Sequence, residues 1–527
     1  MKMKRLFIVA AAATMLAGCG ETEELAQRQD QQSDAEKGRI DFTVYANRNT
    51  RAGQPGEMNM TALQGEGAGF GVFAYYTDNT FYDERSSVAD FMYNQPVTWS
   101  GQRWTYDPVK YWPNEFGSNA ASQGIDYVTF FAYAPFVDFD PVTGAAPAGD
   151  DPDQQQWKNI TSASRSTDQG DPLVRYIVDT NPQSSVDLLW GVAAEKFQGM
   201  APSATTTPPA VGACFLNLSK QVTADDAIKW RFQHALAKLN VQIVAASDVT
   251  TADYEPGATN PAIDDSTRIY LRWIEFKGFA MLGALNLHSG TPGEDGPVPN
   301  WRSYDGTADL KPTVVRFNDG LLDGDEGLTY NTDPNERVLG ALNPDIIESP
   351  TPAAGWDAKS PGITAAGYVN LFKGATDASS SIYVIPTNSP VSVTMSYDIE
   401  TADPKLGKYL SDGKTTGIRI PNVLTQRLDE GLTFKAGKAY TVKIIVGMES
   451  VKVEAVELAS WGNTDDPAEV DIPDNPSGNS DTPSGETTDG LPEGIIICST
   501  NATAAAPSTA KTMPATPWPP SILTAQW

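Results

Sequence analysis

Strict alternation of apolar and polar residues over residues 391–399 is the feature that most limits what this chain can fold into. The apolar members are Val391, Val393, Met395, Tyr397 and Ile399, and every residue between them is polar. A period of two residues is that of a half-buried β-strand rather than a helix. Similar alternating or densely apolar runs occur at residues 40–46, 70–76, 127–134, 174–178, 186–192, 239–244, 269–276, 381–385, 440–446 and 451–458.

Helical periodicity is scarce, and we expect a short helix only at residues 225–239. The chain contains 44 glycines and 38 prolines, which supply turns between short strands. The sequence therefore predicts an all-β fold with many turns and long loops. Its 527 residues are enough for two or more domains with their own cores.

Shifts in composition divide the chain into five segments. We expect a signal peptide at residues 1–18, an acidic tether at 19–38, an N-terminal β domain at 39–222, a C-terminal β domain at 223–472, and a linker with an atypical tail at 473–527. The tether and the linker offer few apolar side chains to bury. Whether the tail is functional or a non-native addition is left open by the sequence.

The first two dozen residues resemble the leader of a bacterial lipoprotein. A basic head precedes an apolar run at residues 6–17, which is too short for a mature membrane-spanning helix. The run ends in Leu16-Ala17-Gly18-Cys19, which resembles a lipobox, so we expect cleavage before Cys19 and lipidation of its thiol. Acyl chains on Cys19 would attach the protein to the outer membrane at the cell surface. The alternative is an ordinary secretory signal with a chance cysteine.

The charge balance limits the partners of the chain. The formal net charge is −28 with a pI near 4.4, so nucleic acid and anionic lipid are poor partners. Besides Cys19, the cysteines are Cys214 and Cys498. One bridge between them is compatible with an extracellular location but is not required.

The residues needed for most catalytic chemistry are scarce. The chain has two histidines, His234 and His288, and we find no nucleophile elbow, P-loop, dinucleotide fingerprint or zinc motif. His234 lies among apolar residues, where a satisfied structural histidine is expected. The Asp-rich segment 319–327 lacks the ligand spacing of an EF-hand and predicts a solvated loop. We therefore expect a non-enzyme without cofactor or metal.

Aromatic residues between positions 99 and 112 allow two interpretations. Trp and Tyr faces can stack on sugars, and they can equally pack in a core, which we favour. The residues concerned are Trp99, Trp104, Tyr106, Tyr111 and Trp112.

A series of short motifs follows the leader. They are IDFTVYA (40–46), TRA (50–52), GVFAYY (71–76), WTYDPVKYWP (104–113), VTFFAYAPF (128–136), VDLLWG (186–191), RFQHALAKLNVQI (231–243), YVIP (383–386) and FKAGKAYTVKIIV (434–446), with a late Trp461. In this order, over residues 1 to about 470, the series resembles the fimbrillin-like (type V pilin) lipoproteins of the Bacteroidales. The resemblance implies two tandem β-sandwich (transthyretin-like) domains and a subunit of a fimbria, or pilus, that supports adhesion.

The resemblance also implies a maturation step. An Arg-specific protease at the outer surface would cut after Arg51 or Arg48, which releases the lipid and the first strand. The inward residues of that strand are Ile40, Phe42, Val44 and Ala46. Its loss would leave an apolar groove with unpaired backbone groups.

A strand from the next subunit would fill that groove by donor-strand exchange. The candidate donors are the tail residues Ile495, Ile496 and Ile497, which we favour, and the hairpin at residues 440–458. The implied partners are neighbouring pilin subunits in a homo- or hetero-polymer, the protease, and a ligand on a host or bacterial surface. Stalk, tip and anchor roles stay open.

Two other functions compete with this one. A monomeric surface lipoprotein that binds glycans would also be acidic, β-rich and lipidated, but it gains nothing from losing its lipid. A surface hydrolase is disfavoured by the residues. Two carboxylates could form a glycosidase pair, but among 66 acidic side chains such a pair is expected by chance and is no evidence of catalysis.

Overall fold

The structure is a computed structural model of the whole chain. It divides into two units, Met1–Asp471 and Ile472–Trp527, and the second unit lies outside the described residues. The described residues are 38–45, 56–113, 126–147, 157–193, 215–218, 228–246, 263, 266–288, 298–318, 337–347, 362–364, 367–376, 380–408, 410, 416–428, 432–448 and 451–458.

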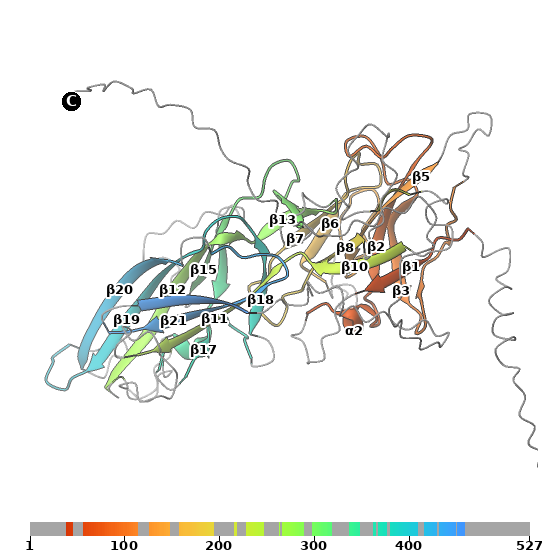
Figure 1. The fold of residues 1–527 in the computed structure, drawn as a ribbon. Coiled ribbons are helices and arrows are strands. Elements are labelled where there is room, and N and C mark those ends of the chain that lie inside the picture. The colour runs from red at the N-terminus through yellow and green to blue at the C-terminus, as the bar shows by residue number, and fades with distance from the viewer. Residues whose placement is uncertain are drawn as a thin grey trace, which may run out of the picture. The chain divides into compact units, whose positions relative to one another are not determined.

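The described part of the chain is built almost entirely from strands (Figure 1). In chain order they are β1 Phe42–Tyr45, β2 Phe70–Thr77, β3 Met92–Trp99, β4 Trp104–Thr105, β5 Tyr127–Ala134, β6 Ile160–Ala163, β7 Leu173–Ile177, β8 Leu189–Ala193, β9 Phe215–Leu218, β10 Ile228–His234, β11 Ala237–Ala245, β12 Thr267–Ala280, β13 Leu282–Asn286, β14 Asn300–Arg302, β15 Thr313–Asn318, β16 Arg337–Ala341, β17 Val369–Asn370, β18 Ser381–Pro386, β19 Ser392–Ala402, β20 Gly417–Arg427, β21 Ala439–Val446 and β22 Val451–Leu458. Helix α2, Met60–Leu63, and the 3-10 turn η1, Pro344–Ile346, interrupt them. Within the described residues, neither has the length and apolar character to cross a bilayer.

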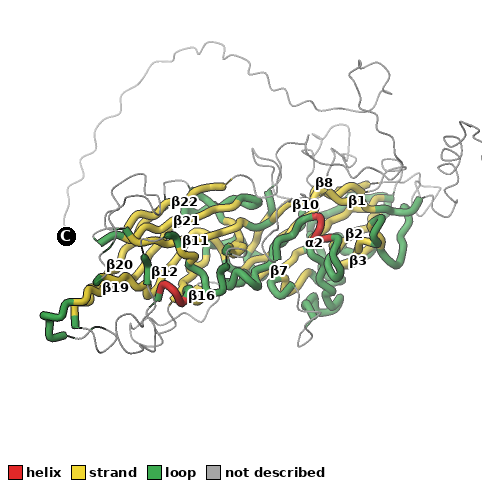
Figure 2. The backbone as a smooth tube through the Cα atoms, turned by 90° about the horizontal axis from the view of Figure 1, so that it is seen from below, coloured by secondary structure: helices red, strands yellow, loops and turns green. Residues whose placement is uncertain are grey.

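The first large sheet has eight strands in the order β1-β10-β8-β5-β2-β3-β4, with β9 paired to β5. The two ends of this order approach each other, because the amide of Ile40 donates to the carbonyl of Lys110 (3.0 Å) just beyond β4. Helix α2 packs against the same sheet through Met60 and Leu63, and Figure 2 shows it beside β10.

Strands β2, β5 and β8 bury side chains on both faces. On β2, Phe70 and Val72 belong to the apolar cluster that includes β1, whereas Phe73 and Tyr75 belong to the larger cluster that extends to the second sheet. Because successive side chains of a strand point to opposite faces, two cores require the dense apolar run that the sequence carries here.

The second large sheet has ten strands, ordered β16-β15-β12-β18-β11-β21-β22, with β19 on β12, β20 on β19 and β17 on β11. A small sheet, β14-β13-β7-β6, combines strands from the two halves of the sequence, since β13 pairs with β7 from Leu282↔Ile177 to Asn286↔Leu173. The expected all-β class is confirmed.

The helix expected at residues 225–239 is wrong. Residues 225–227 lie outside the described residues, residues 228–234 form β10, and residues 237–239 begin β11. The burial of β10 alternates strictly from Ile228 to His234. The side chains of Ile228, Trp230 and Phe232 enter the core of the first sheet, so tertiary pairing overrides the helix-forming residues of the segment.

Sheet membership changes between β10 and β11. The strand β10 pairs with β8 in the first sheet, and β11 pairs with β18 and β21 in the second. The boundary expected between residues 222 and 223 lies before β10, which pairs within the first sheet.

Candidate functional site

The first strand is the candidate functional site. β1 lies at the end of the first sheet, and β10 is its only strand partner among the described strands. The two run parallel, in register from Phe42↔Ile228 to Tyr45↔Arg231. On the other side of β1, the backbone hydrogen bonds in the described part of the chain involve residues just before the strand. The amide of Ile40 donates to the carbonyl of Lys110, and the amide of Trp112 donates to the carbonyl of Gly38. The strand proper therefore depends on one neighbour.

The inward face of β1 is fully buried. Ile40, Phe42 and Val44 are 0%, 5% and 1% exposed. The ring of Phe42 lies 5.3–6.2 Å from the rings of Phe70, Tyr106 and Phe130, measured between centroids. This contact set is apolar, so it provides strong attachment through burial without depending on charge.

We call the surface that β1 covers the first-strand slot. It consists of the ring contacts Phe70, Tyr106 and Phe130, together with Ile228 and Trp230 on β10, which lie in register with Phe42 and Val44. Without β1, these side chains would face water and the outer edge of β10 would lack backbone partners.

The hydroxyl of Tyr106 supplies the polar contact within the slot. It donates to the carbonyl of Ile40 over 2.6 Å and is itself buried. Burial raises the pKa of Tyr106 to about 12. The hydroxyl is therefore neutral and available as a donor at physiological pH.

The chain that follows residue 55 is tied to the body of the protein at Gly56–Met58. The amide of Asp187 donates to the carbonyl of Gly56 (2.9 Å), the Lys238 ammonium pairs with the Glu57 carboxylate (2.9 Å), and the Met58 amide donates to Asp187 Oδ2 (3.3 Å). Gly56 has φ +81°, and a Cβ there would lie 2.3 Å from the carbonyl oxygen of Ser185, so glycine is needed. We call residues 56–58 the anchor.

Asp187 joins the anchor to His234. Its Oδ2 lies 2.7 Å from His234 Nδ1, and the two side chains are 0% and 6% exposed. His234 is thus a buried, partnered residue, as the sequence predicts.

Several residues proposed from the sequence lie outside the described residues. These are the lipidation residue Cys19, the cleavage residues Arg48 and Arg51, the strand residue Ala46, the donor residues Ile495, Ile496 and Ile497, the cysteines Cys214 and Cys498, and the loop 319–327. Residues 46–55, which include both arginines, also lie outside the described residues and connect β1 to the anchor in sequence.

Most of the aromatic candidates for sugar stacking are core residues. Trp104 and Tyr106 are buried in the cluster that includes β1, and Trp99 and Trp112 pack against it. Tyr111 is the exposed member, at 51%. The interpretation as core packing holds for four of the five.

Sequence reasoning missed the anchor and the role of Tyr106. Three distant parts of the chain meet here: Glu57, Asp187, and the nearby pair of His234 and Lys238. No local pattern links these parts. Neither the tripeptide Gly56-Glu57-Met58 nor a single histidine in an apolar strand predicts these contacts, because the residues meet only when the strands pair.

Comparison with known proteins gives one curated match and several structural ones. Fimbrium subunit Fim1C of Phocaeicola vulgatus is 31% identical over 138 residues, which is 26% of this chain and 31% of that protein. The match therefore spans less than a third of the relative. It confirms the resemblance to the fimbrillin-like family that the motifs indicate. No protein-family model matches the chain.

Among solved structures, a fimbrial protein from Bacteroides vulgatus ATCC 8482 aligns with TM-score 0.43 and 17% identity, covering 80% of this chain and 99% of that one. A candidate cell adhesion protein from Bacteroides uniformis ATCC 8492 aligns with TM-score 0.31 and 12% identity, covering 82% and 100%. At these TM-scores the likeness carries no argument.

Proposed function

We propose that this chain is a structural, non-enzymatic subunit of a cell-surface fimbria that matures by losing its first strand and polymerises by strand exchange. The observation that carries the proposal is β1 itself, a buried apolar edge strand with one strand partner, followed directly by two arginines in the range 46–55. A fimbrium subunit among its relatives supports the same function.

Cleavage after Arg51 or Arg48 would separate β1 from the anchor. The lipid on Cys19, the tether and β1 all precede the cut, whereas Glu57 and Met58 follow it. The contacts of the anchor to Asp187 and Lys238 would keep the new N-terminus in place. The cut therefore releases one strand without unravelling the rest of the first sheet.

The energy of strand replacement is sufficient for a durable polymer. Full burial of a large apolar side chain contributes about 1.5–3 kcal/mol. For Ile40, Phe42 and Val44 together this is on the order of 5–9 kcal/mol, before the cost of ordering the strand. A donor strand with the same alternation would regain this burial and the backbone bonds to β10.

The tail is the better donor of the two proposed from the sequence. β21 is paired on both sides, with β11 over Lys238↔Ala439 to Ala245↔Val446 and with β22 over Ala439↔Leu458 to Val446↔Val451. Donating this hairpin would dismantle one edge of the second sheet. Residues 495–497 lie outside the described residues, and a donor taken from them would leave β21 and β22 in place, so we favour them as the donor.

Arg-specific cleavage followed by mild gel electrophoresis tests this function. The chain without its leader is treated with an Arg-specific protease, its new N-terminus is identified by mass spectrometry, and unheated samples are run for ladders. We expect a start at Asn49 or Ala52 and a ladder of oligomers. The double variant R48A/R51A should stay monomeric, and R103A, at an exposed arginine elsewhere, should behave as the parent.

A cut protein that stays monomeric would overturn strand exchange. Deletion of residues 491–527 then identifies the donor: if the cut protein lacking the tail still forms ladders, residues 495–497 are not the donor.

A further inference from the structure

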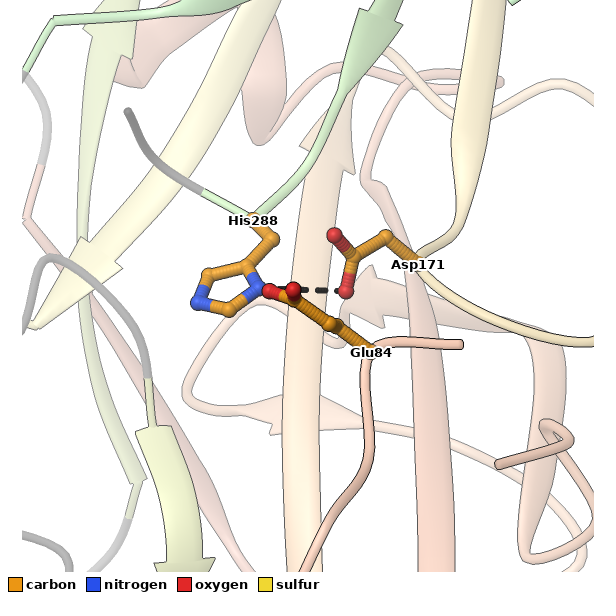
Figure 3. Close-up of side chains that lie close together, drawn as sticks. All are labelled: Glu84, Asp171 and His288. Atoms are coloured by element: carbon orange, nitrogen blue, oxygen red, sulfur yellow. Dashed lines mark hydrogen bonds and ion pairs between the residues drawn. The ribbon is translucent and has the colours of Figure 1, made fainter. Parts of the chain in front are cut away.

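Three loops bring Glu84, Asp171 and His288 together at a site separate from the first-strand slot (Figure 3). Glu84 lies between β2 and β3, Asp171 lies between β6 and β7, and His288 follows β13. Each offers one ligand atom, and these atoms all lie within 4.8 Å of one another. Among the described residues, this is the one such group of three.

The inner pair is held by a hydrogen bond, at a spacing slightly shorter than that of two neighbouring zinc ligands. Asp171 Oδ1 lies 3.1 Å from His288 Nδ1. Zinc bonds of 2.0–2.2 Å in a tetrahedral arrangement place neighbouring ligand atoms roughly 3.3–3.5 Å apart. Glu84 is exposed, so its side chain can rotate to close the third position.

The inner pair is held by neighbouring polar groups. The hydroxyl of Tyr82 donates to Asp171 Oδ1 (2.7 Å), and Asn286 Nδ2 donates to Asp171 Oδ2 (3.0 Å). Asn286 Oδ1 in turn accepts from the backbone amide of His288 (2.8 Å). Partners of this kind fix the orientation of metal ligands and raise affinity.

The cluster opens into a polar cavity of about 310 Å³ that Asn300, Arg85 and Arg302 also line. Arg302 is paired with Asp309 (3.2 Å), which offsets its charge. The carboxylates of Asp171 and Glu84 place negative charge beside the imidazole of His288.

We propose that Glu84, Asp171 and His288 bind a divalent transition-metal ion, for which Zn²⁺ is the best-suited chemistry. An imidazole with two carboxylates is a donor set for zinc, whereas Ca²⁺ prefers oxygen ligands alone. The three ligands leave a fourth position open to water. This site departs from the absence of metal expected from the sequence.

A bound ion would join three loops that are far apart in sequence. Glu84 comes from a loop of the first sheet, and Asp171 and His288 come from loops beside the small sheet that combines the two halves of the sequence. Because the ion binds only when these loops are together, it should stabilise the folded state by mass action.

Calorimetric titration with ZnCl₂ tests the proposal, using the leaderless chain without a histidine tag. We expect one equivalent of Zn²⁺ to bind and to raise the melting temperature, and CaCl₂ to do neither. H288A should abolish this binding, and E84Q should weaken it at least tenfold. Because Glu84 is exposed, E84Q should leave the metal-free melting temperature unchanged.

The matched control is E66Q. Glu66 is an exposed glutamate outside the cluster, so this variant should bind Zn²⁺ as the parent does. His234 does not compete, since it is buried against Asp187. All variants carry Cys214 and Cys498, so any thiol-bound zinc contributes equally. Zinc binding that H288A and E84Q leave unchanged, or no stoichiometric binding at all, would overturn the proposal.

Discussion

The first strand and the final hairpin are both apolar elements at the edge of a sheet, yet they are held very differently. β1 has four residues and one strand partner, whereas β21 pairs along its full eight residues with a strand on each side. Both bury their inward side chains almost completely. Burial therefore does not distinguish them, and the number of backbone neighbours does.

Under the proposed strand exchange, this difference would let β1 leave while β21 stays in place. Losing β1 breaks one ladder and empties one apolar slot, and the anchor fixes the chain beyond it. Losing β21 would break two ladders and separate β22 from its sheet. A subunit that exchanges strands needs one strand with few backbone partners, while its other strands stay paired when that strand leaves.

A buried charge introduced into β1 or into β21 should have the most different effects on folding. V442D and V44D both place a carboxylate at a position that is at most 1% exposed, at a cost of several kcal/mol. We expect V442D to abolish soluble folded protein, because its strand cannot leave. V44D should release β1, retain most β-sheet by circular dichroism, and oligomerise without proteolysis.

The control for this pair is I418D, at a position 47% exposed, which should change neither folding nor size on gel filtration. Equal loss of folding in V44D and V442D would contradict a separable first strand.

Truncating the main side chain of β1 should have the next largest effect. F42A removes ring contacts with Phe70, Tyr106 and Phe130, and we expect a loss of about 3–5 kcal/mol in the free energy of attaching the strand. Hydrogen exchange at the amides of β10 should rise while that of β21 stays constant. Protection of β10 equal to the parent would mean that β1 does not shield that edge.

Weakening the anchor should cost about 1–3 kcal/mol. K238Q removes the ammonium 2.9 Å from the buried Glu57 carboxylate. Urea unfolding should show the loss in the cut protein as well as the intact one, because the anchor follows the cut. The exposed K405Q is the matched control and should be neutral. A loss confined to the intact protein would argue against an anchoring role.

The smallest effect is expected at Tyr106. Y106F removes the hydroxyl that donates to Ile40, at about 1 kcal/mol. The folded pKa of about 12 exceeds the ordinary value of 10.0, so this residue stabilises the fold fully below pH 10. Its contribution is lost as pH rises from 10 to 12. The free energy of unfolding, measured from pH 10 to pH 12, should fall less steeply in Y106F than in the parent. Identical slopes in the two proteins would contradict this role of Tyr106.

Much of the strand pattern was predictable from local sequence. β5 spans Tyr127–Ala134, the range that its apolar run predicts, and β19 includes residues 392–399 of the alternating run. The alternation predicts its apolar face, but Ser396 and Asp398 are buried as well. Strand β10 was not predictable in this way. Ala, Leu and Gln favour a helix locally, so the sequence predicts a helix at residues 225–239, whereas pairing with β8 and β1 selects a strand.

The candidate site divides along the same line. Ile40, Phe42 and Val44 were identifiable from alternation, and the structure buries all three. The anchor was not, because Glu57 meets Lys238 across 181 positions of sequence. The same is true of Asp171 and His288, which are 117 positions apart.

By itself, the sequence determined that this chain folds into strands, which of their faces are apolar, and that arginines follow the first of them. Each of these depends on neighbouring residues and on a period of two, which local sequence carries. Only the tertiary structure decided that β1 has a single partner among the described strands, that β10 belongs to the first sheet, and that Glu84, Asp171 and His288 meet. Sheet order and the meeting of distant loops arise from long-range strand pairing. The physical cause of that pairing is the simultaneous burial of two apolar cores, which no local pattern encodes.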